Sequence, residues 1–191
     1  MKNKGQVWIS AVLYIGLSVA VLALILAAGM PLIEKMKDRN TIVQTKQIFM
    51  DIDYYINFVS GEGVGSKRVL DPVSINAGEL FIRSETDQII WEFKTESQMI
   101  EISTKGDCDD LGNPGAECYF EQEGNVYLYQ EKTLVEDEYL TILRLDYDNK
   151  NNLELNPANP NQFKGKFKLI ISNDRTNNDP TQPVGIGLKI M

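Results

Sequence analysis

The sequence predicts an α+β protein in which a long N-terminal helix packs on an antiparallel β-sheet or β-sandwich. Three observations support this fold class. The chain carries no charged residue between Gly5 and Ile33. Apolar residues then recur at helical spacing up to about residue 60, and short β-type runs fill the rest of the chain. We therefore expect one long helix followed by one folded head domain.

The first element is an uncharged stretch long enough to cross a membrane. From Val7 to Met30 there are 24 residues, which as a helix rise about 36 Å, against roughly 30 Å for a hydrocarbon core. A secretory signal peptide has a shorter apolar region of about 7 to 15 residues, although Ala27, Ala28 and Gly29 imitate its cut site. A retained anchor fits the length, but it does not explain why the helical pattern continues.

The second element is an amphipathic continuation of the same helix. One apolar face is formed by Ile48, Ile52, Tyr55, Ile56 and Val59, and it is extended less regularly by Ile33, Met36 and Val43. The opposite, charged side is expected to carry Lys35, Lys37, Asp38, Arg39 and Lys46. The apolar face predicts that this half lies on the head.

Single residues mark a bend and an end in this helix. Pro31 has no backbone N–H and crowds the carbonyl group four residues earlier, so a bend is expected near Ala27. Gly61 and Gly63 predict the C-terminal end.

Lys4-Gly5-Gln6, placed directly before the apolar run, resembles the class III signal peptide of type IV pilins, particularly archaeal pilin-like proteins. The resemblance implies that a prepilin peptidase cuts after Gly5, so that Gln6 becomes the new N-terminus. Residues 1–5, with Lys2 and Lys4, would then be a leader peptide. Residues 6–60 would form the long helix, and residues 61–191 an extracytoplasmic β-rich head.

The same resemblance implies that residues 6–33 lie first in the membrane and then in a filament core. The assembly residues of that core would include Val7, Trp8, Ile9, Val12, Leu13, Ile15, Leu17 and Val19. Implied partners are further copies of the chain or other pilins, the prepilin peptidase and the pilus assembly machinery.

Charges on the two sides of the run predict its orientation. Lys2, Lys4 and the amino terminus precede the run, whereas the charged residues at 34–39 sum to about plus one. We therefore expect a single span with a cytoplasmic N-terminus and an extracytoplasmic head. The resemblance to type IV pilins implies in addition that the chain ends in a cell-surface filament with an extracellular head.

Beyond about residue 69, eight short β-type runs lack intervening helical patterns: RVLDPVSI, ELFIRS, QIIWEFK, QMIEIST, NVYLYQ, YLTILRLDY, KGKFKLIIS and VGIGLKI. Such runs predict an antiparallel sheet or sandwich. Three polar tracts are expected to be loops: STKGDCDDLGNPGAECYFEQEGN, NNLELNPANPNQ and SNDRTNNDPTQP. DYDNKNNLE begins like a calcium-binding loop, but the lysine at a ligand position favours an Asn-rich turn.

The first polar tract holds both cysteines of the chain, Cys108 and Cys118. An extracytoplasmic head favours a disulfide between them, whereas a reducing compartment would leave two free thiols. No metal site is expected from two cysteines without histidine. Alternatively, the carboxylates of this loop could gather around Ca²⁺, or could simply be solvated: Asp107, Asp109, Asp110 and Glu117.

Composition excludes several functions. The chain has no histidine, which removes Ser-His and Cys-His nucleophile pairs and His-ligated zinc. The formal net charge is −8, and the sequence shows no basic stripe, so nucleic acid is not an expected partner. We expect no enzyme activity and no cofactor. The favoured function is a structural filament subunit, and the alternative is a membrane-anchored β-domain or minor pseudopilin that acts as a binding module.

Overall fold

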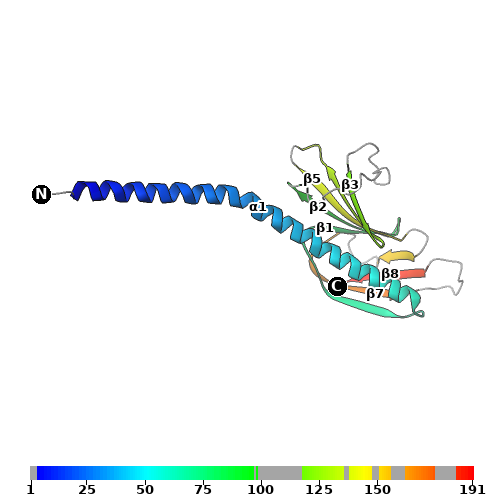
Figure 1. Cartoon of the computed structure of the whole chain (residues 1–191). Helices are drawn as coiled ribbons and strands as arrows, with labels where there is room; N and C mark the ends of the chain where they lie inside the picture. Colours follow the sequence, from blue (N-terminus) through cyan, green and yellow to red (C-terminus); the bar gives the residue numbers. More distant parts are fainter. Residues whose placement is uncertain are drawn as a thin grey trace. The chain divides into compact units, whose positions relative to one another are not determined.

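The computed structural model describes residues 4–96, 98, 118–135, 138–147, 151–155, 162–174 and 184–191. The chain forms two compact units, Met1–Arg39 and Asn40–Met191. The described residues of the first unit are entirely helical. The second unit contains the remainder of the same helix and all strands (Figure 1).

Helix α1 spans Lys4–Gly61 and comprises 58 residues. It runs through Pro31 without a break in its assignment, so the proline does not end the helix. Its last residue is Gly61, as predicted from the glycines there. A helix of this length far exceeds the usual three or four turns of a globular protein.

The strands form one eight-stranded sheet in the order β3-β4-β5-β2-β1-β7-β8-β6. Their bounds are β1 Lys67–Arg83, β2 Gln88–Thr95, β3 Cys118–Glu123, β4 Val126–Lys132, β5 Tyr139–Asp146, β6 Asn151–Leu155, β7 Gln162–Asn173 and β8 Val184–Ile190. All neighbouring strands are antiparallel except β6 and β8, which are parallel. The predicted α+β fold class is confirmed.

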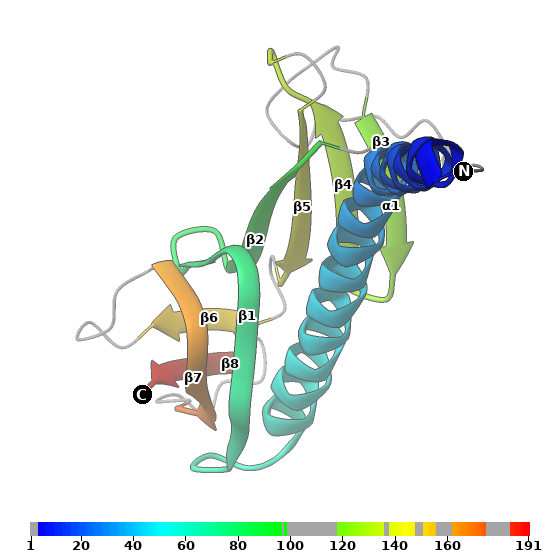
Figure 2. The same cartoon turned by 90° about the vertical axis from the view of Figure 1, so that its left-hand side faces the viewer.

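Residues 40–61 of α1 pack on one face of this sheet (Figure 2). The buried stripe of the helix consists of Ile42, Thr45, Phe49, Ile52, Ile56 and Val59. These residues alternate in steps of three and four, which keeps their side chains on one side of a helix. Opposite them, the sheet contributes Trp91, Leu143 and Leu145, all with no exposed surface.

The predicted stripe was partly wrong. Ile52, Ile56 and Val59 are buried as expected, and Ile48 and Tyr55 are half-buried and pack against the core. Val43 is 58% exposed, while its neighbour Ile42 takes the buried position. Adjacent helical residues differ by about 100° in direction, so a stripe displaced by one residue faces solvent.

Lys46 was also misplaced, because it does not lie on a free charged surface. Its ammonium group bonds Glu121 at 2.7 Å and Glu123 at 2.9 Å, both on β3. Because β3 lies in a tract predicted to be a loop, the sequence did not indicate that Glu121 and Glu123 face Lys46.

Three strands differ from the predicted pattern. β1 joins two predicted runs into one strand. Its register with β7 shifts between Leu70 and Val73 and again between Ile75 and Leu80. These irregularities let the strand continue past Pro72 and Gly78. β3 and β6 fall in tracts predicted as loop and turn. β6 forms despite its asparagines because its backbone pairs with β8. Most of the predicted QMIEIST strand lies outside the described residues.

Candidate functional site

The clearest functional feature is the apolar segment of α1, residues 6–33. Four consecutive residues of a helix point in all directions around its axis. Here all four side chains are exposed: Val12 is 66% exposed, Leu13 68%, Tyr14 71% and Ile15 66%. Of the described assembly residues predicted from the sequence, Trp8, Leu17 and Val19 are equally open, at 75%, 63% and 62%. The side chains of Val7 and Ile9 lie outside the described residues.

Such a surface must be covered by something apolar. Transfer of one large apolar side chain out of water is favourable by roughly 1.5–3 kcal/mol in free energy. In an isolated chain, all of these side chains stay in solvent. Among the described residues, α1 is the one helix long and apolar enough to cross a membrane. The segment therefore suits either a bilayer or a dry interface with other helices.

The segment contains few polar groups, and the helix itself bonds one of them. The hydroxyl of Ser18 donates to the carbonyl oxygen of Tyr14 at 2.8 Å. This satisfies the hydroxyl without water, as lipid requires. Pro31 contributes no N–H, which leaves the carbonyl of Ala27 without its usual helical donor.

The predicted cleavage junction lies at the very start of α1. The helix begins at Lys4, so Gly5 and Gln6 belong to its first turn, where backbone N–H groups have no partner within the helix. The side chain of Gln6 and the whole of Lys2 lie outside the described part of the chain. A peptidase that cuts after Gly5 would need this turn to unwind locally.

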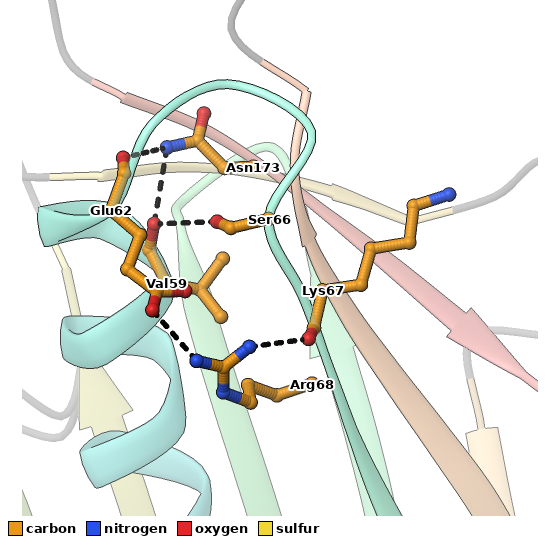
Figure 3. Close-up of polar contacts among 6 residues, drawn as sticks. All are labelled: Val59, Glu62, Ser66, Lys67, Arg68 and Asn173. Atoms are coloured by element: carbon orange, nitrogen blue, oxygen red, sulfur yellow. Dashed lines mark hydrogen bonds and ion pairs between the residues drawn. The ribbon is translucent and has the colours of Figure 1, made fainter.

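The C-terminal end of α1 is held by a side chain of β7 and by one from the segment that leads into β1 (Figure 3). The amide of Asn173 donates to the carbonyl oxygens of Val59 and Glu62, both at 3.1 Å. The hydroxyl of Ser66 also donates to Val59, at 3.3 Å. These bonds satisfy carbonyl groups that a helix end leaves open. Asn173 itself is only 2% exposed.

A positively charged side chain also contacts this end of α1. The Arg68 guanidinium bonds the Glu62 carboxylate at 2.7 Å and lies 4.7 Å from the ring centroid of Phe58. The last turn of α1 contains no basic residue of its own. Arg68 therefore supplies, from β1, the positive charge that the negative end of the helix dipole favours.

A second attachment lies midway along the packed half of α1. Asp53 Oδ1 accepts hydrogen bonds from the Tyr147 hydroxyl at 2.8 Å, from the Asn57 amide at 2.9 Å and from the Asn125 amide at 3.0 Å. Tyr147 follows β5, and Asn125 lies in the β3–β4 turn. Burial, and then the charge and hydrogen bond of Asp53, raise the pKa of Tyr147 far above its ordinary value.

Lys46 makes the third attachment. Burial alone would lower its pKa, but the hydrogen bonds and charges of Glu121 and Glu123 outweigh this effect, so the pKa of Lys46 is raised overall. The two carboxylates are about half exposed. We therefore expect this ion pair to contribute little to the free energy of unfolding, like other solvent-exposed ion pairs.

Several predicted sites lie outside the described residues: Cys108, Asp107, Asp109, Asp110 and Glu117. Cys118 is the first residue of β3, but its side chain is also outside them, so the disulfide and calcium predictions stay predictions. Within the described ranges, no group of three potential metal ligands occurs.

Sequence reasoning missed Asp53, Tyr147 and Asn173 as a group. Asn173 falls in a tract predicted to be a loop, and the Asp53–Tyr147 contact joins residues 94 positions apart. No local pattern marks such a pair. No family model, curated protein or solved structure matches this chain.

Proposed function

We propose that this chain is a structural subunit of a type IV pilus-like surface filament. The prepilin peptidase removes residues 1–5, and the mature chain assembles through the apolar segment. The observation that carries the proposal is the all-round exposure of residues 12–15, on a helix that continues into a firmly attached second half. The Lys4-Gly5-Gln6 junction at the start of that helix supports it.

Assembly would exchange one apolar environment for another. Before assembly, lipid covers the apolar segment; afterwards, equivalent segments of neighbouring copies cover it. Between apolar helices in lipid, packing replaces the hydrophobic effect as the driving term. Gly16 and Gly29 both have open space around the position that a Cβ would occupy, which allows close approach by another helix.

The attachments at Asn173, Asp53 and Lys46 support the mechanical part of this role. They connect the helix to β7, to the end of β5 and to β3. A load applied to the helix is thereby shared among strands distant in sequence. In a filament, this keeps the head joined to its assembled helix.

The test is the mature N-terminus together with filament formation. Native protein is purified from its host membrane, and mass spectrometry is expected to show a chain that begins at Gln6. Electron microscopy is expected to show filaments. Gly5→Val should leave the leader attached and abolish filaments, because a branched side chain hinders close approach of a protease to the backbone.

Gly16→Val is the matched control, since it adds the same side chain within the apolar segment and should leave processing unchanged. A native chain that begins at Met1, or after Ala28, contradicts the proposal. Correct processing without filaments, in the presence of the full assembly machinery, would favour the membrane-anchored binding module instead.

A further inference from the structure

Trp8 is the most exposed large apolar side chain that the structure describes in the apolar segment of α1, at 75%. Trp8 and Tyr14 are the aromatic residues of this segment, and the sequence has none between residues 15 and 48. Aromatic side chains are therefore confined to the end of the segment that carries the predicted cleavage junction. Trp8 follows that junction by about 4 Å along the helix axis, at a rise of 1.5 Å per residue.

The indole ring of Trp8 has a preferred depth in a bilayer. It combines a large apolar surface with one N–H donor. The hydrocarbon core offers no acceptor for that donor, whereas the boundary between headgroups and acyl chains suits both parts of the ring. Lys4 precedes Trp8 by one helical turn, and its ammonium group needs water. Both residues therefore favour a position of this turn at the membrane–water interface.

The length of the apolar segment leaves its depth undetermined without such an anchor. From Val7 to Ile33 there are 27 residues, which as a helix rise about 40 Å, against roughly 30 Å for a hydrocarbon core. The excess of about 10 Å allows the helix to tilt or to shift along its axis. An interfacial ring at position 8 fixes the N-terminal end of the segment, so the tilt or shift is taken up at the other end.

This depth matters for the cleavage that the proposed function requires. Hydrolysis adds water across the Gly5–Gln6 peptide bond and leaves a carboxylate on Gly5 and an amine on Gln6. Water must reach this bond, and the hydrocarbon core contains none. We propose that Trp8 is a positioning residue that holds the bond at the membrane–water interface, within reach of the prepilin peptidase. This inference rests on the proposed function.

The first experiment measures the depth of Trp8 without any peptidase. The full chain is reconstituted in phosphatidylcholine vesicles whose acyl chains carry bromine either near the headgroup or near the chain end, and quenching of tryptophan fluorescence is recorded. The signal of Trp91, which is buried in the second unit, is measured with Trp8→Leu and subtracted. Bromine near the headgroup should quench Trp8 at least about twofold more strongly than bromine near the chain end.

The second experiment measures cleavage with the prepilin peptidase reconstituted in the same vesicles, and mass spectrometry detects the product. Trp8→Leu keeps an apolar side chain but should be cut about tenfold more slowly, because a displaced peptide bond is poorly aligned with the catalytic groups. Trp8→Tyr should be cut within about twofold of the original rate, since tyrosine also prefers the interface. Leu24→Ala is the control. It removes a similarly exposed apolar side chain far from the junction and should leave the rate unchanged.

A relocated ring separates the position of the anchor from its chemistry. Trp8→Leu combined with Val12→Trp moves the ring by one turn, about 6 Å along the axis. Bromine near the headgroup should still quench this ring most strongly, because the ring keeps its depth and the helix shifts instead. The displaced junction should then be cut as slowly as in Trp8→Leu.

The inference is overturned if Trp8 is quenched mainly by bromine near the chain end. It is also overturned if Trp8→Leu or the relocated ring is cut at the original rate, or if Leu24→Ala slows cleavage equally. An original chain that is not cut after Gly5 contradicts the proposed function itself, and this inference with it, whatever the depth of Trp8. The two kinds of failure are therefore distinguishable, and none of these results depends on filament formation.

Discussion

The Tyr147 hydroxyl donates a 2.8 Å hydrogen bond to Asp53 Oδ1, joining the end of the β5 strand to the middle of the packed half of the helix. Tyr147 has no exposed surface, so its phenol has left water entirely. The bond to a carboxylate compensates for that loss. This contact makes the tyrosine a sensitive reporter of helix attachment.

Replacing Tyr147 by phenylalanine is expected to cost about 1–3 kcal/mol in the free energy of unfolding near pH 7, because a hydrogen bond to a charged group is lost. The packing of the ring is retained. Chemical denaturation of the full chain in micelles, followed by tryptophan fluorescence, measures the change. Tyr54→Phe is the control, since Tyr54 is 61% exposed, and it should change stability by less than about 0.5 kcal/mol.

The raised pKa of Tyr147 also predicts a pH effect. The folded chain keeps the phenol protonated where the unfolded chain loses its proton, so this stabilisation is fully present below pH about 10 and decreases above it. The slope is about 1.4 kcal/mol per pH unit. Denaturation between pH 8 and 11 should show a steeper loss for the original chain than for Tyr147→Phe. Parallel curves for the two proteins would contradict the assignment.

Asn173→Ala is expected to destabilise the second unit by about 1–3 kcal/mol, because the carbonyl groups of Val59 and Glu62 lose a donor in a buried place. For a chain of this size, that corresponds to a decrease in Tm of roughly 2–10 °C. Differential scanning fluorimetry measures the shift. Asn76→Ala, at an exposed position, is the control, and an equal decrease for both variants would refute the capping role.

Gly78→Ala is expected to be more harmful than Gly124→Ala, although both glycines have positive φ, 73° and 62°. A Cβ at residue 78 would clash with the backbone carbonyl oxygen of Glu92 and would lie 2.6 Å from Trp91 Nε1, which donates to the Ala77 carbonyl. Nothing lies within 4 Å of a Cβ at residue 124. The difference between the two should be about 1–3 kcal/mol, from overpacking alone. Urea denaturation of both variants measures it; equal values would contradict the close packing of Gly78 against the Glu92 backbone and the Trp91 ring.

Val19→Asp should prevent stable membrane insertion, because an aspartate near the centre of a span costs about 2.5–3.5 kcal/mol. The fraction of protein that resists carbonate extraction from membranes is the readout. Val43→Asp is the matched control, since Val43 is 58% exposed in the second unit, and it should remain in the membrane. If both variants extract equally, the apolar segment is not what holds the chain there.

The helix was predictable because its signals are local. The absence of charged residues from the apolar segment and the glycines at the helix end can both be read directly from the sequence. The period of the packed half gave Ile52, Ile56 and Val59 correctly, but it placed Val43 in the stripe instead of Ile42. A face that covers about a third of a turn is defined by what packs on it, and the strands that pack on this helix are distant from it in the sequence.

Local patterns in the sequence are enough to predict an uncharged helix, its amphipathic continuation and a sheet that follows. The cap that Asn173 provides and the contact between Asp53 and Tyr147 exist only in the folded chain. Strand register explains this difference. Alternation along one strand separates two faces, but only pairing between distant strands decides which residues become neighbours on each face.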